Sequence, residues 1–106
     1  MYHPTLMKGN EQVVIDNERQ REWISVFSAL ASEARLQMVL LLAKGKLECQ
    51  EILDRVDLSQ PAISYHLGKL ERAGILIKEK KGSRNCYRLD KRINGLIKII
   101  SGKEKE

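Results

Sequence analysis

The sequence has 106 residues, of which 42% are hydrophobic and 31% charged, and its formal net charge is +5 at pH 7. This length fits one domain with a small core, so pairing with a second copy would bury additional apolar surface. Only 5% of the residues are aromatic, which disfavours the stacking platform of a protein that binds single-stranded nucleic acid. The longest apolar run, Met38 to Ala43, is too short to cross a bilayer, and the polar N-terminus has no secretory signal, so we expect a soluble cytoplasmic protein.

The charge is unevenly distributed along the chain. Residues 1–65 contain seven Lys or Arg and nine Asp or Glu, a net of −2, whereas residues 66–106 contain twelve and five, a net of +7. A basic C-terminal half indicates a surface directed at a polyanion. A solvated surface with uneven charge is the alternative, since basic charge by itself does not identify a partner.

Apolar periodicity predicts two helices in the first half of the chain. Residues 1–15 show no period, and we expect a flexible N-terminal arm there. A helix is predicted from Asn17, because apolar residues then recur at helical spacing: Trp23, Val26, Phe27 and Leu30. Ser32 is a typical N-cap for a second helix, which Gly45 ends.

Two further helices follow, separated by a tight turn. The first is predicted over Cys49 to Val56, and the second begins after the capping residue Ser59 and runs to about Ala73. Pro61 is tolerated in the first turn of that helix, where the backbone amides have no helical partner. Its buried stripe is predicted to be Ile63, Leu67 and Leu70.

Beyond Gly74 the period changes. Residues 75–89 predict a β-hairpin with a charged tip at Gly82-Ser83, and a short last helix carries Ile93, Leu96, Ile97 and Ile100 at helical spacing. We therefore predict a mainly α fold of about five helices with a two-stranded wing, the winged helix-turn-helix. The expected organisation is an arm at 1–15, a winged helix DNA-binding and dimerisation domain at 16–101, and a charged tail at 102–106.

The fourth predicted helix presents a polar face that suits a major groove, which admits one α-helix. With Ile63 at the centre of the buried face, about 100° per residue puts Pro61, Ser64, Tyr65, Lys69 and Arg72 on the opposite side, with Gln60 at the edge. The hairpin adds cations for the DNA backbone: Lys80, Lys81 and Arg84. The polar face of this helix, or the basic hairpin, taken alone could simply be a solvent-exposed surface. The presence of both in one small domain favours DNA binding.

Three stretches resemble the ArsR/SmtB family of bacterial and archaeal regulators: ALASEARLQMVLLL (29–42), LSQPAISYHLGKLERAGIL (58–76) and GSRNCYRL (82–89). The resemblance spans roughly residues 22–100, and implies a homodimer that represses by binding an inverted-repeat operator. By similarity, Gln60, Ser64 and His66 match recognition-helix positions. Tyr65 stands where the family often has His, and Gly68 where Lys is frequent.

The dimer interface is predicted on the first and last helices, because their apolar stripes exceed what one small core needs. The residues concerned are Trp23, Val26, Phe27, Leu30, Ile93, Leu96, Ile97 and Ile100.

The family's thiophilic-metal site is not expected in this chain. Glu48 and Gln50 stand at the two positions where related regulators have a cysteine pair, and the last helix contains no histidine. A soft-metal site needs convergent soft ligands, so we predict no metal and no cofactor.

The two cysteines leave two interpretations open. Cys49 is either a small buried apolar residue or a thiol activated by a helix N-terminus, and Cys86 shares a strand face with Arg84 and Arg88 that we expect to be exposed and electropositive. A redox role is therefore possible for either. His3 is expected to be an arm residue, and no motif of an enzyme is present. The alternative function is a winged-helix module that binds a protein and not DNA.

Overall fold

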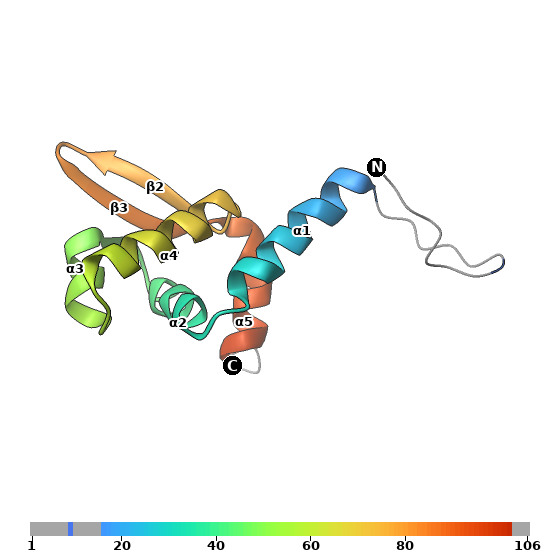
Figure 1. Cartoon of the computed structure of the whole chain (residues 1–106), viewed down its shortest axis with the longest axis horizontal. Coiled ribbons are helices and arrows are strands. Elements are labelled where there is room, and N and C mark those ends of the chain that lie inside the picture. Colours follow the sequence, from blue (N-terminus) through green and yellow to red (C-terminus); the bar gives the residue numbers. More distant parts are fainter. Residues whose placement is uncertain (1–8, 10–15, 103–106) are drawn as a thin grey trace.

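The computed structural model describes residue 9 and residues 16–102 (Figure 1). The predicted arm, apart from Gly9, and the tail beyond Gly102 lie outside the described residues. Five helices and a small sheet occur in this order: α1 (Asn17–Leu30), α2 (Glu33–Leu42), β1 (Leu47–Glu48), α3 (Cys49–Arg55), α4 (Gln60–Arg72), β2 (Leu76–Lys81), β3 (Arg84–Leu89), the 3₁₀ turn η2 (Lys91–Ile93) and α5 (Asn94–Ser101). The predicted fold class is confirmed.

Side-chain caps start the longer helices where the sequence predicts them. The hydroxyl of Ser32 accepts a hydrogen bond from the Arg35 amide at 3.3 Å, and that of Ser59 accepts from the Ala62 amide at 3.2 Å. Each cap satisfies one of the amides that the first helical turn leaves unpaired. The cap at Ser59 thereby fixes the start of α4 at Gln60.

A glycine in the left-handed backbone conformation ends α4, and the chain then enters the wing. Gly74 has φ +79°, and the amide of Ile75 donates to the Leu70 carbonyl at 3.0 Å while the Gly74 amide donates to the Glu71 carbonyl, also at 3.0 Å. This pair of bonds is a Schellman motif, which requires a residue that tolerates positive φ. The wing therefore leaves α4 in a fixed direction.

The sheet has three strands, one more than predicted, in the order β1-β3-β2. The hairpin turn is the two-residue loop Gly82-Ser83, with Lys81 paired to Arg84 across it. The added strand β1 pairs antiparallel to β3, with Leu47 opposite Tyr87 and Glu48 opposite Cys86. Two residues show no alternation that a pattern could detect, so only the pairing with β3 makes this segment a strand.

The core lies between α1, α2, α4 and the base of the sheet. It includes the predicted stripe of α4, since Ile63, Leu67 and Leu70 are buried, together with Met38 and Val39 of α2. No single helix in the described ranges is long and apolar enough to cross a membrane. Only α1 and α2 taken together pass on length and composition, and they meet at a 100° bend.

Half of the predicted dimer stripe belongs to the core of the single chain, so those residues have little surface left for a partner. Four of its eight residues are buried there: Val26, Leu30, Ile93 and Ile97. Trp23 and Leu96 are half-buried, while Phe27 and Ile100 are exposed. Two exposed apolar side chains on the same helices, Ile24 and Ile99, were missed because they lie off the predicted stripe.

Candidate nucleic-acid interface

The helix α4 divides sharply into a buried and an exposed side. Opposite its buried stripe, six polar or small residues are exposed to solvent: Gln60, Pro61, Ser64, Tyr65, Lys69 and Arg72. Gln60 and Ser64 lie in the first turns, and Lys69 and Arg72 lie in the last turn. In a helix that enters a major groove, the first turns are the part that reaches base edges.

Side chains along the exposed side of α4 contact one another one turn apart. The ammonium of Lys69 lies 5.7 Å from the centroid of the Tyr65 ring, within the range of a cation–π interaction. The guanidinium of Arg72 folds back toward Gly68, where an added Cβ would lie 3.2 Å from its Nη1. Glycine at this position costs helix stability and makes room for the arginine.

His66 is not arranged like its neighbours. It is half-buried, and its Nδ1 lies 3.1 Å from Nη1 of Arg35 on α2. Desolvation by burial, and then the nearby Arg35 charge, lower the pKa of His66 below its ordinary value of 6.5. The imidazole therefore joins α4 to α2 in its neutral form, a role that sequence alone did not indicate.

The wing carries cations at its tip, and one of them, Arg84, is paired within the protein, as are two cations further from the tip. Lys80 and Lys81 are exposed, whereas Arg84 Nη1 lies 3.2 Å from a carboxylate oxygen of Glu48. Arg88 Nε and Lys46 Nζ lie 3.0 and 3.4 Å from the two carboxylate oxygens of Glu79. Hydrogen bonds from Arg88 and from Lys46 hold the pKa of Glu79 below its ordinary value.

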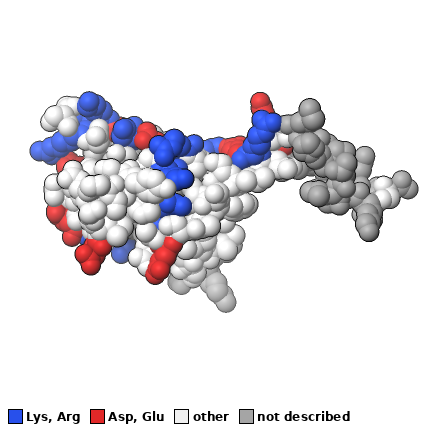
Figure 2. All heavy atoms as spheres, viewed as in Figure 1, with Lys and Arg blue, Asp and Glu red and all other residues white. Residues whose placement is uncertain are grey.

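The charge pattern is visible on the surface. Figure 2 shows Lys and Arg gathered over the wing and over the C-terminal end of α4, with a few Asp and Glu atoms among them, while other Asp and Glu side chains lie along the lower edge of the same face. The basic side chains thus predominate on the upper side of this face.

The expectation of an exposed, electropositive Cys86 is wrong. Its side chain is 5% exposed, and its two partners across the sheet are the acidic residues Glu48 and Glu79. The arginines that share its strand face are the ones paired with those carboxylates. Cys49 is half-buried at the start of α3.

No set of metal ligands converges in the described residues. Within residues 9 and 16–102 there is no cluster of three or more His, Cys, Asp or Glu side chains that could hold a metal ion. Around Cys49, Glu48 pairs with Arg84, and the amide of Glu48 donates to Glu51 at 2.7 Å. The two carboxylates next to the Cys49 thiol are therefore already engaged, that of Glu48 by Arg84 of the wing and that of Glu51 by a backbone amide at the start of α3.

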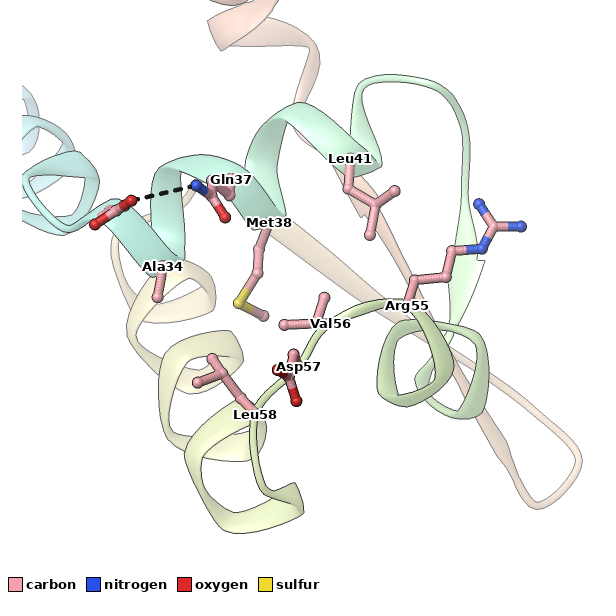
Figure 3. Close-up of a pocket in the computed structure, with 9 residues that line it drawn as sticks. Ala34, Gln37, Met38, Leu41, Arg55, Val56, Asp57 and Leu58 are labelled. Atoms are coloured by element: carbon pink, nitrogen blue, oxygen red, sulfur yellow. Dashed lines mark hydrogen bonds between the residues drawn. The ribbon is translucent and has the colours of Figure 1, made fainter.

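A groove of about 500 Å³ between α2 and the turn from α3 to α4 has a different character (Figure 3). Its floor is apolar, with Met38, Leu41 and Val56, and its rim carries both signs of charge. In Figure 3, Met38 and Val56 point toward one another, and a 3.5 Å hydrogen bond joins Gln37 to Glu33 on the rim. A surface of this kind does not favour a polyanion.

Comparison with known proteins identifies the family. The profile described as "Bacterial regulatory protein, arsR family" matches residues 32–78. The uncharacterized HTH-type transcriptional regulator MJ1325 of Methanocaldococcus jannaschii is 34% identical over 85 residues, which cover 78% of this chain and 96% of that protein. The chain belongs to the ArsR family.

Other relatives agree with this assignment. The arsenic resistance transcriptional regulator ArsR1 of Pseudomonas putida is 46% identical over 65 residues, 60% of this chain and 51% of that protein. The arsenical resistance operon repressor of Escherichia coli is 42% identical over 71 residues, 66% of this chain. The chain thus spans about half of the first relative and 61% of the second.

A solved structure shares the fold. The winged helix-turn-helix domain Mb0332 of Mycobacterium bovis, described as homodimeric, superposes with a TM-score of 0.75 at 24% identity, covering 84% of this chain and 83% of that one. The family profile and the relatives confirm the predicted resemblance to the ArsR family, and this structure agrees with the predicted winged helix-turn-helix fold. ArsR proteins are DNA-binding regulators and not enzymes.

Proposed function

We propose that this ArsR-family chain is a sequence-specific double-stranded DNA-binding repressor that acts as a homodimer in the cytoplasm on an inverted-repeat operator. The observation that carries the proposal is the division of α4, which exposes Gln60, Ser64, Lys69 and Arg72 on the side opposite its buried stripe. The name of the Escherichia coli relative supports repression as the direction of regulation.

The proposed contacts divide by chemistry. Gln60, Ser64 and Tyr65, in the first turns of α4, meet base edges, where short or planar hydrogen-bonding groups discriminate between bases, and Pro61 offers an apolar contact beside them. Lys69 and Arg72, with Lys80, Lys81 and Arg84 of the wing, meet the phosphate backbone. His66 has a supporting role, since Arg35 holds it against α2.

The dimer is proposed to form through the exposed apolar residues of α1 and α5. Ile24, Phe27 and Ile99 are 58%, 56% and 61% exposed, and Ile100, next to Ile99 in sequence, is 36% exposed. These two helices lie at the end of the molecule away from the wing tip (Figure 1). A second copy that covers them would place two α4 helices for two half-sites of one operator. Sedimentation that finds only monomer at micromolar concentration would contradict the dimer.

The chain is further proposed to lack the cysteine-pair metal site of its relatives. With Glu48 bound to Arg84, Cys49 has no second soft ligand beside it in the described residues. Equilibrium dialysis with Zn(II) and As(III) tests this. One tightly bound ion per chain that is lost in Cys49→Ser would disprove it.

DNA binding itself is tested by fluorescence polarisation on a random-sequence duplex at two salt concentrations. We expect affinity to fall steeply with salt, because cations that neutralise phosphates release condensed counterions. Little binding at either concentration would favour the alternative, a winged-helix module that binds a protein.

A further inference from the structure

A small polar pocket lies where α1, α2 and the C-terminal half of α4 meet. Its volume is about 210 Å³, and its polar lining is Ser25 and Ser28 of α1, Arg35 of α2, and Lys69 and Arg72 of α4. Sites for drug-sized ligands span about 300–1,000 Å³, so this pocket suits a single small group. Three cations and two hydroxyls are donors that a tetrahedral oxyanion prefers, and no carboxylate is among the lining residues described.

The cations of this pocket are not neutralised within the described part of the protein. Arg84 and Arg88 of the wing each lie within 4.0 Å of a carboxylate oxygen. Among residues 16–102, no such ion pair involves Arg35, Lys69 or Arg72. Like charges brought together at one site raise the local positive potential, which a bound anion would relieve.

The pocket is also held in place before any ligand arrives. Nε of Arg35 donates to the carbonyl of Ala29 at 2.6 Å, and its Nη1 contacts His66 at 3.1 Å. These two contacts fix the plane of the guanidinium and leave its Nη2 to donate elsewhere. Gly68 lets Arg72 fold back along α4. A preorganised donor set loses less conformational entropy on binding.

We propose that this pocket binds one tetrahedral oxyanion, and that the oxyanion is a phosphodiester of the DNA backbone beside the groove that α4 enters. The second half of the inference rests on the proposed function. Gln60 and Lys69 are nine residues apart, about 13 Å along a helix at 1.5 Å per residue. The major groove is about 12 Å wide. With Gln60 at the bases, Lys69 and the pocket therefore reach the backbone.

The first arm of the test measures binding to a random-sequence 24-base-pair duplex across a salt series. Ser28→Asp places a carboxylate in the pocket, whereas Gln20→Glu adds the same charge to an exposed part of α1 outside it. We expect Ser28→Asp to weaken binding about tenfold, through loss of one phosphate contact together with repulsion of that phosphate, and to flatten the salt slope by about one unit. Gln20→Glu should change affinity less than twofold.

Lys69→Gln is a second variant, which removes one pocket cation without adding charge. It should weaken binding in the same direction as Ser28→Asp. Equal melting temperatures of the variants and the wild type exclude misfolding as the cause.

The second arm uses inorganic phosphate alone, with sodium chloride at matched ionic strength as the control. Amide resonances of Ser25 and Ser28 should shift with phosphate in the wild type and not in Ser28→Asp. Loss of duplex affinity in Ser28→Asp together with this shift in the wild type supports a backbone phosphate as the ligand of the pocket. Loss of duplex affinity without the shift would mean only that the added carboxylate repels DNA, and would overturn the oxyanion pocket. A shift without any duplex effect supports a free anion and overturns the DNA part.

The remaining outcomes separate the two proposals. If the wild type binds duplex, Ser28→Asp and Gln20→Glu both bind it as well as the wild type does, and phosphate causes no shift, the pocket is overturned while the proposed function stands. If the wild type binds no duplex but phosphate shifts the pocket resonances, the proposed function fails and the oxyanion site stands.

Discussion

Two basic regions of this molecule differ in how they hold their charge. In the wing, Arg84 and Arg88 each pair with a carboxylate of the same chain, as does Lys46 just before β1, and the Arg84 side chain is still 71% exposed. At the junction of α1, α2 and α4, Arg35 is fixed by a backbone carbonyl and a histidine, and no described carboxylate pairs with it. The comparison shows that net charge alone does not say which cations can meet a polyanion without breaking an internal contact.

The largest expected effect concerns stability at the two arginines. Arg35→Ala should destabilise the fold by about 3 kcal/mol, because it leaves the part-buried Ala29 carbonyl and His66 without their partner. Arg84→Ala should cost less than about 1 kcal/mol, since an exposed ion pair contributes little. Urea unfolding of both variants measures the difference. Equal losses of unfolding free energy in the two variants would contradict this difference between the part-buried contacts of Arg35 and the exposed ion pair of Arg84.

The next comparison separates sequence-specific base contacts from nonspecific phosphate contacts with DNA. Gln60→Ala should weaken binding to the operator by about 1–3 kcal/mol and leave random duplex nearly unchanged, because base contacts discriminate sequence. Lys81→Ala should weaken both duplexes and flatten the salt slope by about one unit, because a phosphate contact carries no sequence information. Polarisation titrations on both duplexes measure this. Equal losses for Gln60→Ala would mean that α4 does not read the DNA.

A smaller effect is expected from releasing a paired wing cation. Glu48→Gln removes the negative partner of Arg84 while keeping the size of the side chain. Affinity for random duplex should rise by up to about 1 kcal/mol, which is the range of an exposed ion pair. The reason is that Arg84 no longer has to break its contact with the Glu48 carboxylate before it can bind a phosphate. Glu51→Gln, which removes one negative charge from the first turn of α3 and keeps an oxygen that can accept from the Glu48 amide, is the matched control. An unchanged affinity in Glu48→Gln would show that Arg84 does not meet DNA.

The smallest effect is a dependence of stability on pH, which differs between the two regions. The folded pKa of His66 lies below 6.5, so between the two pKa values the unfolded chain binds more protons and stability falls as pH drops through about 6.5. The folded pKa of Glu79 lies below 4.5, so its contribution is present above about pH 4.5 and is lost at lower pH. Melting temperatures between pH 7.5 and 5.5 should decline less in His66→Gln than in the wild type. A wild-type slope retained in this variant would refute the assignment to His66.

Local pattern was sufficient for most of the fold. The buried stripe Ile63, Leu67 and Leu70 follows from helical spacing, and Ser32 and Ser59 cap helices because their hydroxyls reach amides three residues ahead. The exposed face of α4 follows by the same geometry, because placing one side of a helix in a core fixes the opposite side. Its contacts with DNA remain a prediction.

Other features depend on contacts between residues far apart in sequence. The strand β1 exists only by pairing with β3, and Cys86 is buried beside Glu48 and Glu79 although its own strand pattern predicts exposure. Val26 and Ile97 belong to the core of one chain, whereas Ile24 and Ile99 are left on the surface. An amphipathic stripe in the sequence does not reveal how much of its width is covered by a neighbouring helix of the same chain.

The sequence by itself determined the helices, their caps, the wing and the polar face of α4, because each depends on neighbours within about one helical turn or one hairpin. Only the tertiary structure decided which cations are paired, since Arg84 meets Glu48 across 36 residues and Arg35 meets His66 across 31. Charge acts through space, and the packing of α1, α2 and α4 gathers Arg35, Lys69 and Arg72 at one pocket.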